Sequence, residues 1–258
     1  MINHTIESIH RSKHGKLSDK WTSYLQYYDN LFLPLRDENI NMLEIGVQNG
    51  GSLETWCSYF KNASLILGCD IDPKCLDLKF IDPRVNLVIG DANISQTFDS
   101  IKDICTEFDI VIDDGSHKSI DIINSFINYF PLLKSGGIYV IEDTHTLYSD
   151  LFGGGVLNQL SAYAFFKKII DIVNFQFWRD ELSIQTYLRT FLPHTQIPGF
   201  LLDGWIDSIS FRNSIITITK AHEPGHDKLG DRLLTGDSAA VQRTFGVVHG
   251  SSGETRSL

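Results

Sequence analysis

Two short segments of the sequence combine acidic side chains with a histidine. Residues 113–117 read DDGSH and residues 142–145 read EDTH, and each segment follows an apolar run. Carboxylates gathered in one site repel one another unless protons or a cation intervene. Oxygen ligands suit a hard ion such as Mg²⁺, which keeps positions open for water or substrate oxygens. The two segments together predict a divalent-cation site, although a single carboxylate such as Asp114 could instead cap the next helix.

The histidines of these segments are candidates for proton transfer. His117 lies three residues past Asp114, in what we expect to be the first turn of a helix. Its neutral imidazole could take a proton from a substrate hydroxyl held beside the cation. His145 is the competing candidate for the base and could equally bind substrate. We therefore predict His117 and His145 as the catalytic residues.

A glycine-rich segment lies earlier in the chain. Residues 44–52 read EIGVQNGGS, and glycines after a strand let the backbone approach a ligand closely before a helix begins. Successive strand ends then carry acids, and an acid roughly 20 residues after such a loop typically binds ribose hydroxyls. This pattern predicts a nucleoside cofactor bound by a set of seven residues. They are Glu44, Gly46, Gly50, Ser52, Asp70, Asp91 and Asp113.

The cofactor suggested by this loop is either a nicotinamide dinucleotide or S-adenosylmethionine. The loop lacks the G-x-G-x-x-G spacing that seats a pyrophosphate on a helix N-terminus. An acid at Glu44 would repel a pyrophosphate but suits a ligand that bears an ammonium group. We therefore predict S-adenosylmethionine.

The elements that must position these residues alternate between short β-branched runs and amphipathic stretches, as in parallel βαβ units. The predicted strands are 42–46, 65–70, 85–89, 108–113 and 137–142, and the predicted helices lie near 51–61, 73–79, 93–106, 117–132 and 156–175. Two further runs flank Arg212 and Asn213 as a hairpin. The pattern resembles the Rossmann-like, seven-stranded sheet of class I methyltransferases, in which the last strand inserts antiparallel. The predicted fold class is α/β.

The chain divides into three predicted parts: an N-terminal helical segment 1–40, a domain 41–220, and a C-terminal tail or arm 221–258. The first part is polar to amphipathic, with an apolar stripe at helical spacing. The stripe indicates packing against the domain, or alternatively a lid or an oligomer contact. Its members are Trp21, Tyr24, Leu25, Tyr28 and Leu31.

Composition narrows the class of protein. With 32 acidic and 22 basic residues the net charge is -10, the opposite of what phosphate neutralisation requires, so we expect no nucleic-acid partner. The four cysteines show no C-x-x-C spacing and indicate reduced thiols in a cytosolic protein. The N-terminus lacks the apolar core of a signal peptide, and no apolar run approaches the roughly 20 residues that span a bilayer. We predict a cytoplasmic protein without a membrane span.

The motifs LEIGVQNGGSLETW, IDDGSH and YVIEDTHTLY resemble those of the metal-dependent sugar O-methyltransferases of macrolide biosynthesis. Cephalosporin hydroxylase-like proteins share similar strand-end motifs. The resemblance extends over about residues 15–220. It implies Asp114, Glu142 and Asp143 as metal ligands and His117 as general base, and it implies a homo-oligomer.

The predicted function is therefore Mg²⁺-dependent transfer of a methyl group from S-adenosylmethionine to a hydroxyl of a sugar. The acceptor would be a small-molecule glycoside or a polysaccharide-type sugar. Two alternatives remain at this point: another enzyme on the same sheet, hydroxylase-like or nicotinamide-linked, and a non-catalytic partner subunit that binds S-adenosylmethionine.

Overall fold

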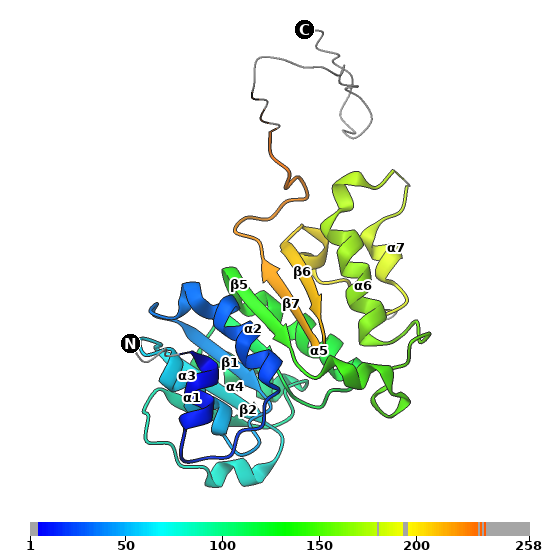
Figure 1. The fold of residues 1–258 in the computed structure, drawn as a ribbon. Coiled ribbons are helices and arrows are strands. Elements are labelled where there is room, and N and C mark those ends of the chain that lie inside the picture. Colours follow the sequence, from blue (N-terminus) through cyan, green and yellow to red (C-terminus); the bar gives the residue numbers. More distant parts are fainter. Residues whose placement is uncertain (1–4, 180, 193–195, 232, 234, 236–258) are drawn as a thin grey trace.

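The computed structural model describes residues 5–231, 233 and 235, apart from 180 and 193–195 (Figure 1). Its centre is a seven-stranded sheet in the order β3-β2-β1-β4-β5-β7-β6. The strands are β1 (Asn41–Ile45), β2 (Leu65–Asp70), β3 (Val85–Ile89), β4 (Phe108–Asp113), β5 (Leu133–Ile141), β6 (Ile206–Arg212) and β7 (Ile215–Lys220). β1 to β5 are parallel, and β7 pairs antiparallel with both β5 and β6. The predicted fold class and the inserted last strand are confirmed.

Both faces of the sheet are buried, because side chains alternate between them along each strand. Leu43 and Val111 belong to one apolar cluster, whereas Met42 and Ile110 belong to the other. The first cluster includes side chains of α4 (Ser95–Ile104), α5 (Ser119–Tyr129), α6 (Ala162–Val173), α7 (Ile184–Leu188) and α8 (Gly199–Leu202). The second includes side chains of α1 (Ile6–Ser12), α2 (Thr22–Phe32) and α3 (Gly51–Tyr59). Figure 1 shows α6 and α7 beside β6 and β7, at the opposite end of the sheet from α1 and α3.

Strand register brings the ends of the three central strands to one level. Ile45 of β1 is paired with Asp113 of β4, which is paired in turn with Ile141 of β5. The ladder continues one residue further, because the Asp114 amide donates to the Ile45 carbonyl (2.8 Å) and the Glu142 amide donates to the Asp113 carbonyl (2.9 Å). The two acidic segments therefore begin side by side.

Several predicted boundaries differ from those observed. The stretch 73–79 forms one 3₁₀ turn, Pro73–Asp77, because Pro73 and the Asp72 cap favour a turn that the following residues do not extend. The helix predicted from 156 begins at Ala162, where the Ser161 side chain caps it. β5 begins at Leu133, earlier than predicted. α7 and α8 were not predicted, since both are short and have no clear period.

The N-terminal segment is helical as predicted, and α2 buries Tyr24, Leu25 and Tyr28 of the apolar stripe. Of the predicted tail, most residues lie outside the described part. Within the described part, the His226 ring packs against Phe175 and hydrogen-bonds the Leu202 carbonyl. The described helices include none long and apolar enough to cross a membrane.

The centre of one cluster gives a stability prediction. Phe126 of α5 is fully buried and contacts five aromatic rings: Phe130, Tyr139, Phe165, Phe166 and Phe200. Phe126→Ala should lower the free energy of unfolding by about 3–5 kcal/mol, because transfer and cavity costs add. Ile120→Ala, on the exposed side of the same helix, should change it by less than about 0.5 kcal/mol. Equal losses in urea denaturation of the two variants would contradict this packing.

Candidate active site

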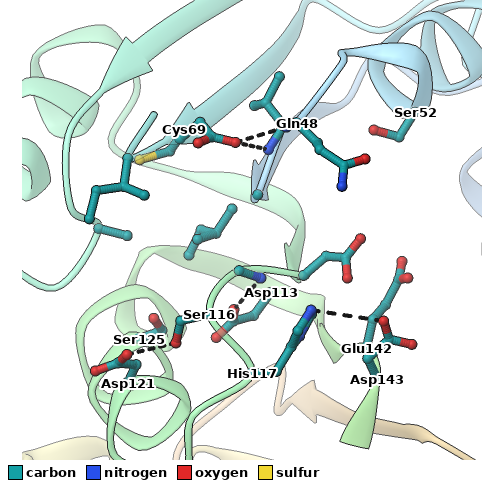
Figure 2. Close-up of a pocket in the computed structure, with 18 of the residues that line it drawn as sticks. Gln48, Ser52, Cys69, Asp113, Ser116, His117, Asp121, Ser125, Glu142 and Asp143 are labelled. Atoms are coloured by element: carbon teal, nitrogen blue, oxygen red, sulfur yellow. Dashed lines mark hydrogen bonds and ion pairs between the residues drawn. The ribbon is translucent and has the colours of Figure 1, made fainter. Parts of the chain in front are cut away.

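A cavity of about 950 Å³ opens at the carboxyl ends of the parallel strands, where ligands bind in sheets of this type. Figure 2 shows Gln48 and Ser52 on one side of it and His117, Glu142 and Asp143 on the other. Segment 17–21 and Tyr24 complete the lining. The cavity therefore brings together the glycine loop, both acidic segments and the start of α2.

The glycine loop is shaped by close contacts that exclude larger residues. Gly46 has a φ of +95°, and a Cβ there would lie 2.1 Å from the Asp114 carbonyl oxygen. One Asp70 carboxylate oxygen accepts from the amides of Val47 (2.7 Å) and Gln48 (2.8 Å). Asp70 lines the cavity, so this predicted ribose ligand also fixes the loop.

The residues predicted to bind the cofactor divide into two groups. Gly46, Ser52, Asp70, Asp91 and Asp113 line the cavity, whereas Glu44 and Gly50 are not among the lining residues. Glu44 is fully buried behind the loop, where its carboxylate accepts from the Ser52 hydroxyl (2.8 Å). Gly50 adopts a left-handed conformation and caps α3.

Asp113 is the most unusual acid of the lining. It is buried, one of its oxygens accepts a long bond from the Gly115 amide (3.3 Å), and the other makes no hydrogen bond of good geometry among the described residues, although the Ser125 and Tyr139 hydroxyls lie near the carboxyl. Burial raises the pKa of this carboxyl to about 7. An unsatisfied buried acceptor costs stability, and a donor group of a bound ligand would satisfy it.

Three side chains beside the cavity could hold a metal ion. Asp114, His117 and Asp143 each offer one ligand atom, and these atoms lie within 4.8 Å of one another. The set of two carboxylates and one imidazole suits a divalent cation. Two of the three predicted ligands are therefore in this group. The third, Glu142, follows β5 directly and also lines the cavity.

Glu142 is buried between two donors of the N-terminal segment. Its Oε1 accepts from the Tyr28 hydroxyl and its Oε2 from the Lys20 ammonium, both at 2.8 Å. Burial raises the pKa of Glu142 above its usual value, although the Lys20 ammonium opposes this shift. Lys20 also contacts Asp114 and lies 3.8 Å from Glu44. Burial alone would lower the pKa of Lys20, but these three carboxylates raise it well above its usual value.

The prediction that His117 lies in the first turn of a helix is wrong. α5 begins two residues later, at Ser119. The His117 backbone is left-handed, with a φ of +58°. The His117 Nε2 lies 3.8 Å from an Asp143 oxygen. His145 is half exposed and its Nδ1 lies 2.6 Å from the Ser214 hydroxyl in the β6–β7 turn.

The sequence reasoning missed the polar contacts of the N-terminal segment. Lys20 belongs to no recognisable motif, and the spacing of Tyr24 and Tyr28 predicts only an apolar stripe. The Tyr24 hydroxyl donates to Asp143 (2.8 Å), just as Tyr28 donates to Glu142. The available signal was that tyrosines, rather than phenylalanines, occur at two positions of the buried stripe, since a buried hydroxyl needs a partner.

Glu44 gives a prediction for pH dependence, because burial raises its pKa from 4.5 to about 7, although Lys20 opposes this shift. Between those values the folded protein holds a proton that the unfolded chain has lost. The free energy of unfolding therefore decreases as pH rises from about 4.5 through about 7. Glu44→Gln removes this titration, so the variant should gain on the order of 3 kcal/mol relative to wild type between pH 4.5 and 8.

The control for this measurement is Glu54→Gln. Burial opposes the shift, but hydrogen bonds from Lys16 and Lys13 lower the pKa of Glu54 below 4.5. The stability that the Glu54 carboxylate contributes is lost only at more acidic pH. The difference in free energy of unfolding between Glu54→Gln and wild type should therefore stay constant from pH 5 to 8. Urea denaturation across this range measures both differences. If the difference between Glu44→Gln and wild type were also constant with pH, the raised pKa of the buried Glu44 carboxyl would be contradicted.

The chain is similar in sequence and in fold to known methyltransferases. Residues 43–144 match a family described as a methyltransferase domain. The 8-demethyl-8-alpha-L-rhamnosyl tetracenomycin-C 2'-O-methyltransferase of Streptomyces olivaceus is 36% identical over 169 residues, 62% of this chain and 43% of the relative. The mycinamicin VI 2''-O-methyltransferase of Micromonospora griseorubida is 36% identical over 164 residues, 59% of this chain and 40% of the relative.

A solved structure extends the similarity. The MycE methyltransferase from the mycinamycin biosynthetic pathway, in complex with Mg, SAH and mycinamycin VI, superposes with a TM-score of 0.66 at 28% identity. The match covers 86% of this chain and 53% of that chain. The chain thus spans about half the length, or less, of the relatives it matches. The resemblance predicted from the motifs is confirmed: residues 43–144 match the methyltransferase domain family, and the chain is similar in sequence and fold to sugar O-methyltransferases.

Proposed function

We propose that this chain transfers a methyl group from S-adenosylmethionine to a sugar hydroxyl with the help of a divalent cation. The observation that carries the proposal is the position of Asp114, His117 and Asp143 on the same cavity as the glycine loop. The similar MycE methyltransferase was solved with Mg and SAH. The acceptor would be a sugar of a glycoside or of a polysaccharide.

The residues of the cavity fit the cofactor. Gly46 lets the glycine loop lie directly against the Asp114 carbonyl, because a Cβ there would come within 2.1 Å of that oxygen, and the loop so placed lines the cavity. Asp113 presents a buried oxygen that makes no hydrogen bond of good geometry among the described residues, which suits a donor such as an ammonium or amino group. Asp70 ends β2, Asp91 lies just after the neighbouring β3, and both line the cavity, so they suit ribose or amino groups. S-adenosylmethionine, when bound, supplies an activated methyl group.

The acidic residues fit the cation. We propose Asp114, Glu142 and Asp143 as its ligands, in agreement with the earlier prediction. Asp114 and Asp143 face His117, and Glu142 lines the same side of the cavity. A bound divalent ion lowers the pKa of a sugar hydroxyl that it contacts.

His117 would then act as the general base. Its imidazole lines the cavity, is partly exposed, and lies near Asp143, which can orient the ring and stabilise the imidazolium form. His145 also lines the cavity but is more exposed and interacts with Ser214, so we assign it to substrate binding. Transfer itself needs alignment of the acceptor oxygen with the methyl group.

The proposal extends to the setting of the enzyme. A net charge of -10 favours a small acceptor over a nucleic acid. The four cysteines are free, which suits the reducing cytoplasm. We also propose a homo-oligomer on the family resemblance, and a division into segment 1–40, domain 41–220 and arm or tail 221–258 on the sequence pattern.

Cofactor choice can be tested by thermal unfolding. S-adenosylhomocysteine at about 100 times its Kd should add roughly 2.7 kcal/mol to the free energy of unfolding and raise Tm by several degrees. NADH at the same concentration should have no effect. Stabilisation by NADH alone, or by neither compound, would overturn the methyltransferase proposal.

The role of His117 can be tested by its alanine variant. His117→Ala should reduce kcat by on the order of 10²–10⁴-fold, with unchanged affinity for S-adenosylhomocysteine and for Mn²⁺. His145→Ala should mainly raise the KM of the acceptor. A wild-type kcat for His117→Ala would exclude it as the base, and weaker Mn²⁺ binding would show that it is a ligand instead.

A further inference from the structure

We propose that Lys20, Tyr24 and Tyr28 are positioning residues of the metal site. This inference rests on the proposed function, because it concerns the carboxylates assigned there to the cation. The three residues are spaced four apart, so Tyr24 and Tyr28 lie on one face of α2, and Lys20 lies one residue before the N-cap Trp21. They lie outside residues 43–144, which match the methyltransferase domain family.

Each proposed ligand receives a hydrogen bond from this face. Lys20 donates to both Asp114 and Glu142. Tyr28 donates to the second oxygen of Glu142, and Tyr24 donates to Asp143. The carboxylates of three ligands, which come from two strands of the sheet, are therefore oriented by one segment of about nine residues.

Burial argues that these contacts are not incidental. Tyr24, Tyr28 and Glu142 are each no more than 1% exposed, and a polar group at such depth costs free energy unless it is paired. The same stripe continues to Phe32, which stacks on Tyr28 at 5.0 Å between ring centroids and packs against Trp56 and Phe60. Where the stripe faces no carboxylate, a phenyl ring therefore suffices for packing.

Charge explains why a lysine begins the series. Glu44, Asp114 and Glu142 end adjacent strands, and all three lie within 3.8 Å of the Lys20 ammonium. The Lys20 side chain lines the same cavity but is only 6% exposed, whereas the Asp114, His117 and Asp143 side chains are 21–28% exposed. The ammonium offsets the repulsion among these carboxylates, and Asp114, His117 and Asp143 each still offer one ligand atom to a divalent ion.

The test is a titration with Mn²⁺ alone, followed by the paramagnetic signal of the free ion, on Tyr24→Phe and Tyr28→Phe. Each change removes one hydroxyl and keeps the ring. The Kd for Mn²⁺ should rise about 10–100-fold, as is typical when a partner of a metal ligand is lost. Affinity for S-adenosylhomocysteine should stay unchanged. Lys20→Gln should weaken Mn²⁺ binding at least as much.

Tyr27→Phe is the matched control, because Tyr27 is on the same helix but donates to Thr217 (2.9 Å) rather than to a carboxylate. Its Kd for Mn²⁺ should equal that of wild type. If Lys20→Gln fails to fold, Tyr24→Phe and Tyr28→Phe still show whether this segment supports Mn²⁺ binding.

Two outcomes would overturn the inference while leaving the proposed function intact. In the first, Tyr24→Phe and Tyr28→Phe bind Mn²⁺ as Tyr27→Phe does, so the hydroxyls only support the fold. In the second, the variants bind Mn²⁺ more tightly, so the N-terminal groups compete with the ion. A wild-type protein that binds no Mn²⁺ would overturn the metal-dependent function and this inference together.

Discussion

Mutual repulsion of carboxylates at one edge of the sheet is the constraint on which the site depends. Glu44, Asp114, Glu142 and Asp143 are brought together by the register of β1, β4 and β5. Two of them are fully or almost fully buried, where like charges interact strongly. Lys20 and the tyrosine hydroxyls of α2 offset part of this cost. The remaining negative charge faces the cavity and favours a cation.

The sheet and the N-terminal segment therefore contribute differently to one site. The parallel strands supply the ligands and the glycine loop, because their carboxyl ends meet at one edge. The N-terminal segment supplies donors, and it also covers the loop: a Cβ on Gly51 would lie 2.2 Å from the Leu17 carbonyl oxygen. Lys13 and Lys16 hold this segment on Glu54 of α3. The N-terminal segment, packed in this way on the loop and on α3, therefore both covers the cavity and orients the carboxylates.

Glu44 illustrates how a residue can be important to the site without lining it. The sequence pattern predicts a direct contact with the cofactor, but the structure buries its side chain behind the loop, with Ser52 and Lys20 as neighbours. Its backbone lies at the strand end as expected, while its side chain points toward the second cluster, where α3 covers it. Side chains alternate between the two faces of a sheet along each strand, and this alternation directs the Glu44 side chain toward the second cluster and away from the cavity.

Local signals in the sequence predict the parallel strands and the acidic segments, because apolar runs and strand-end motifs need no tertiary information, and the resemblance to class I methyltransferases implies the inserted last strand. The sequence also indicated His117 and the glycine loop. Tertiary structure alone decided that Lys20, Tyr24 and Tyr28 meet those acids, since the contacts join residues about 90 to 120 positions apart. A buried tyrosine and a buried phenylalanine produce the same apolar period, so only the packed partner distinguishes a positioning hydroxyl from a ring that fills the core.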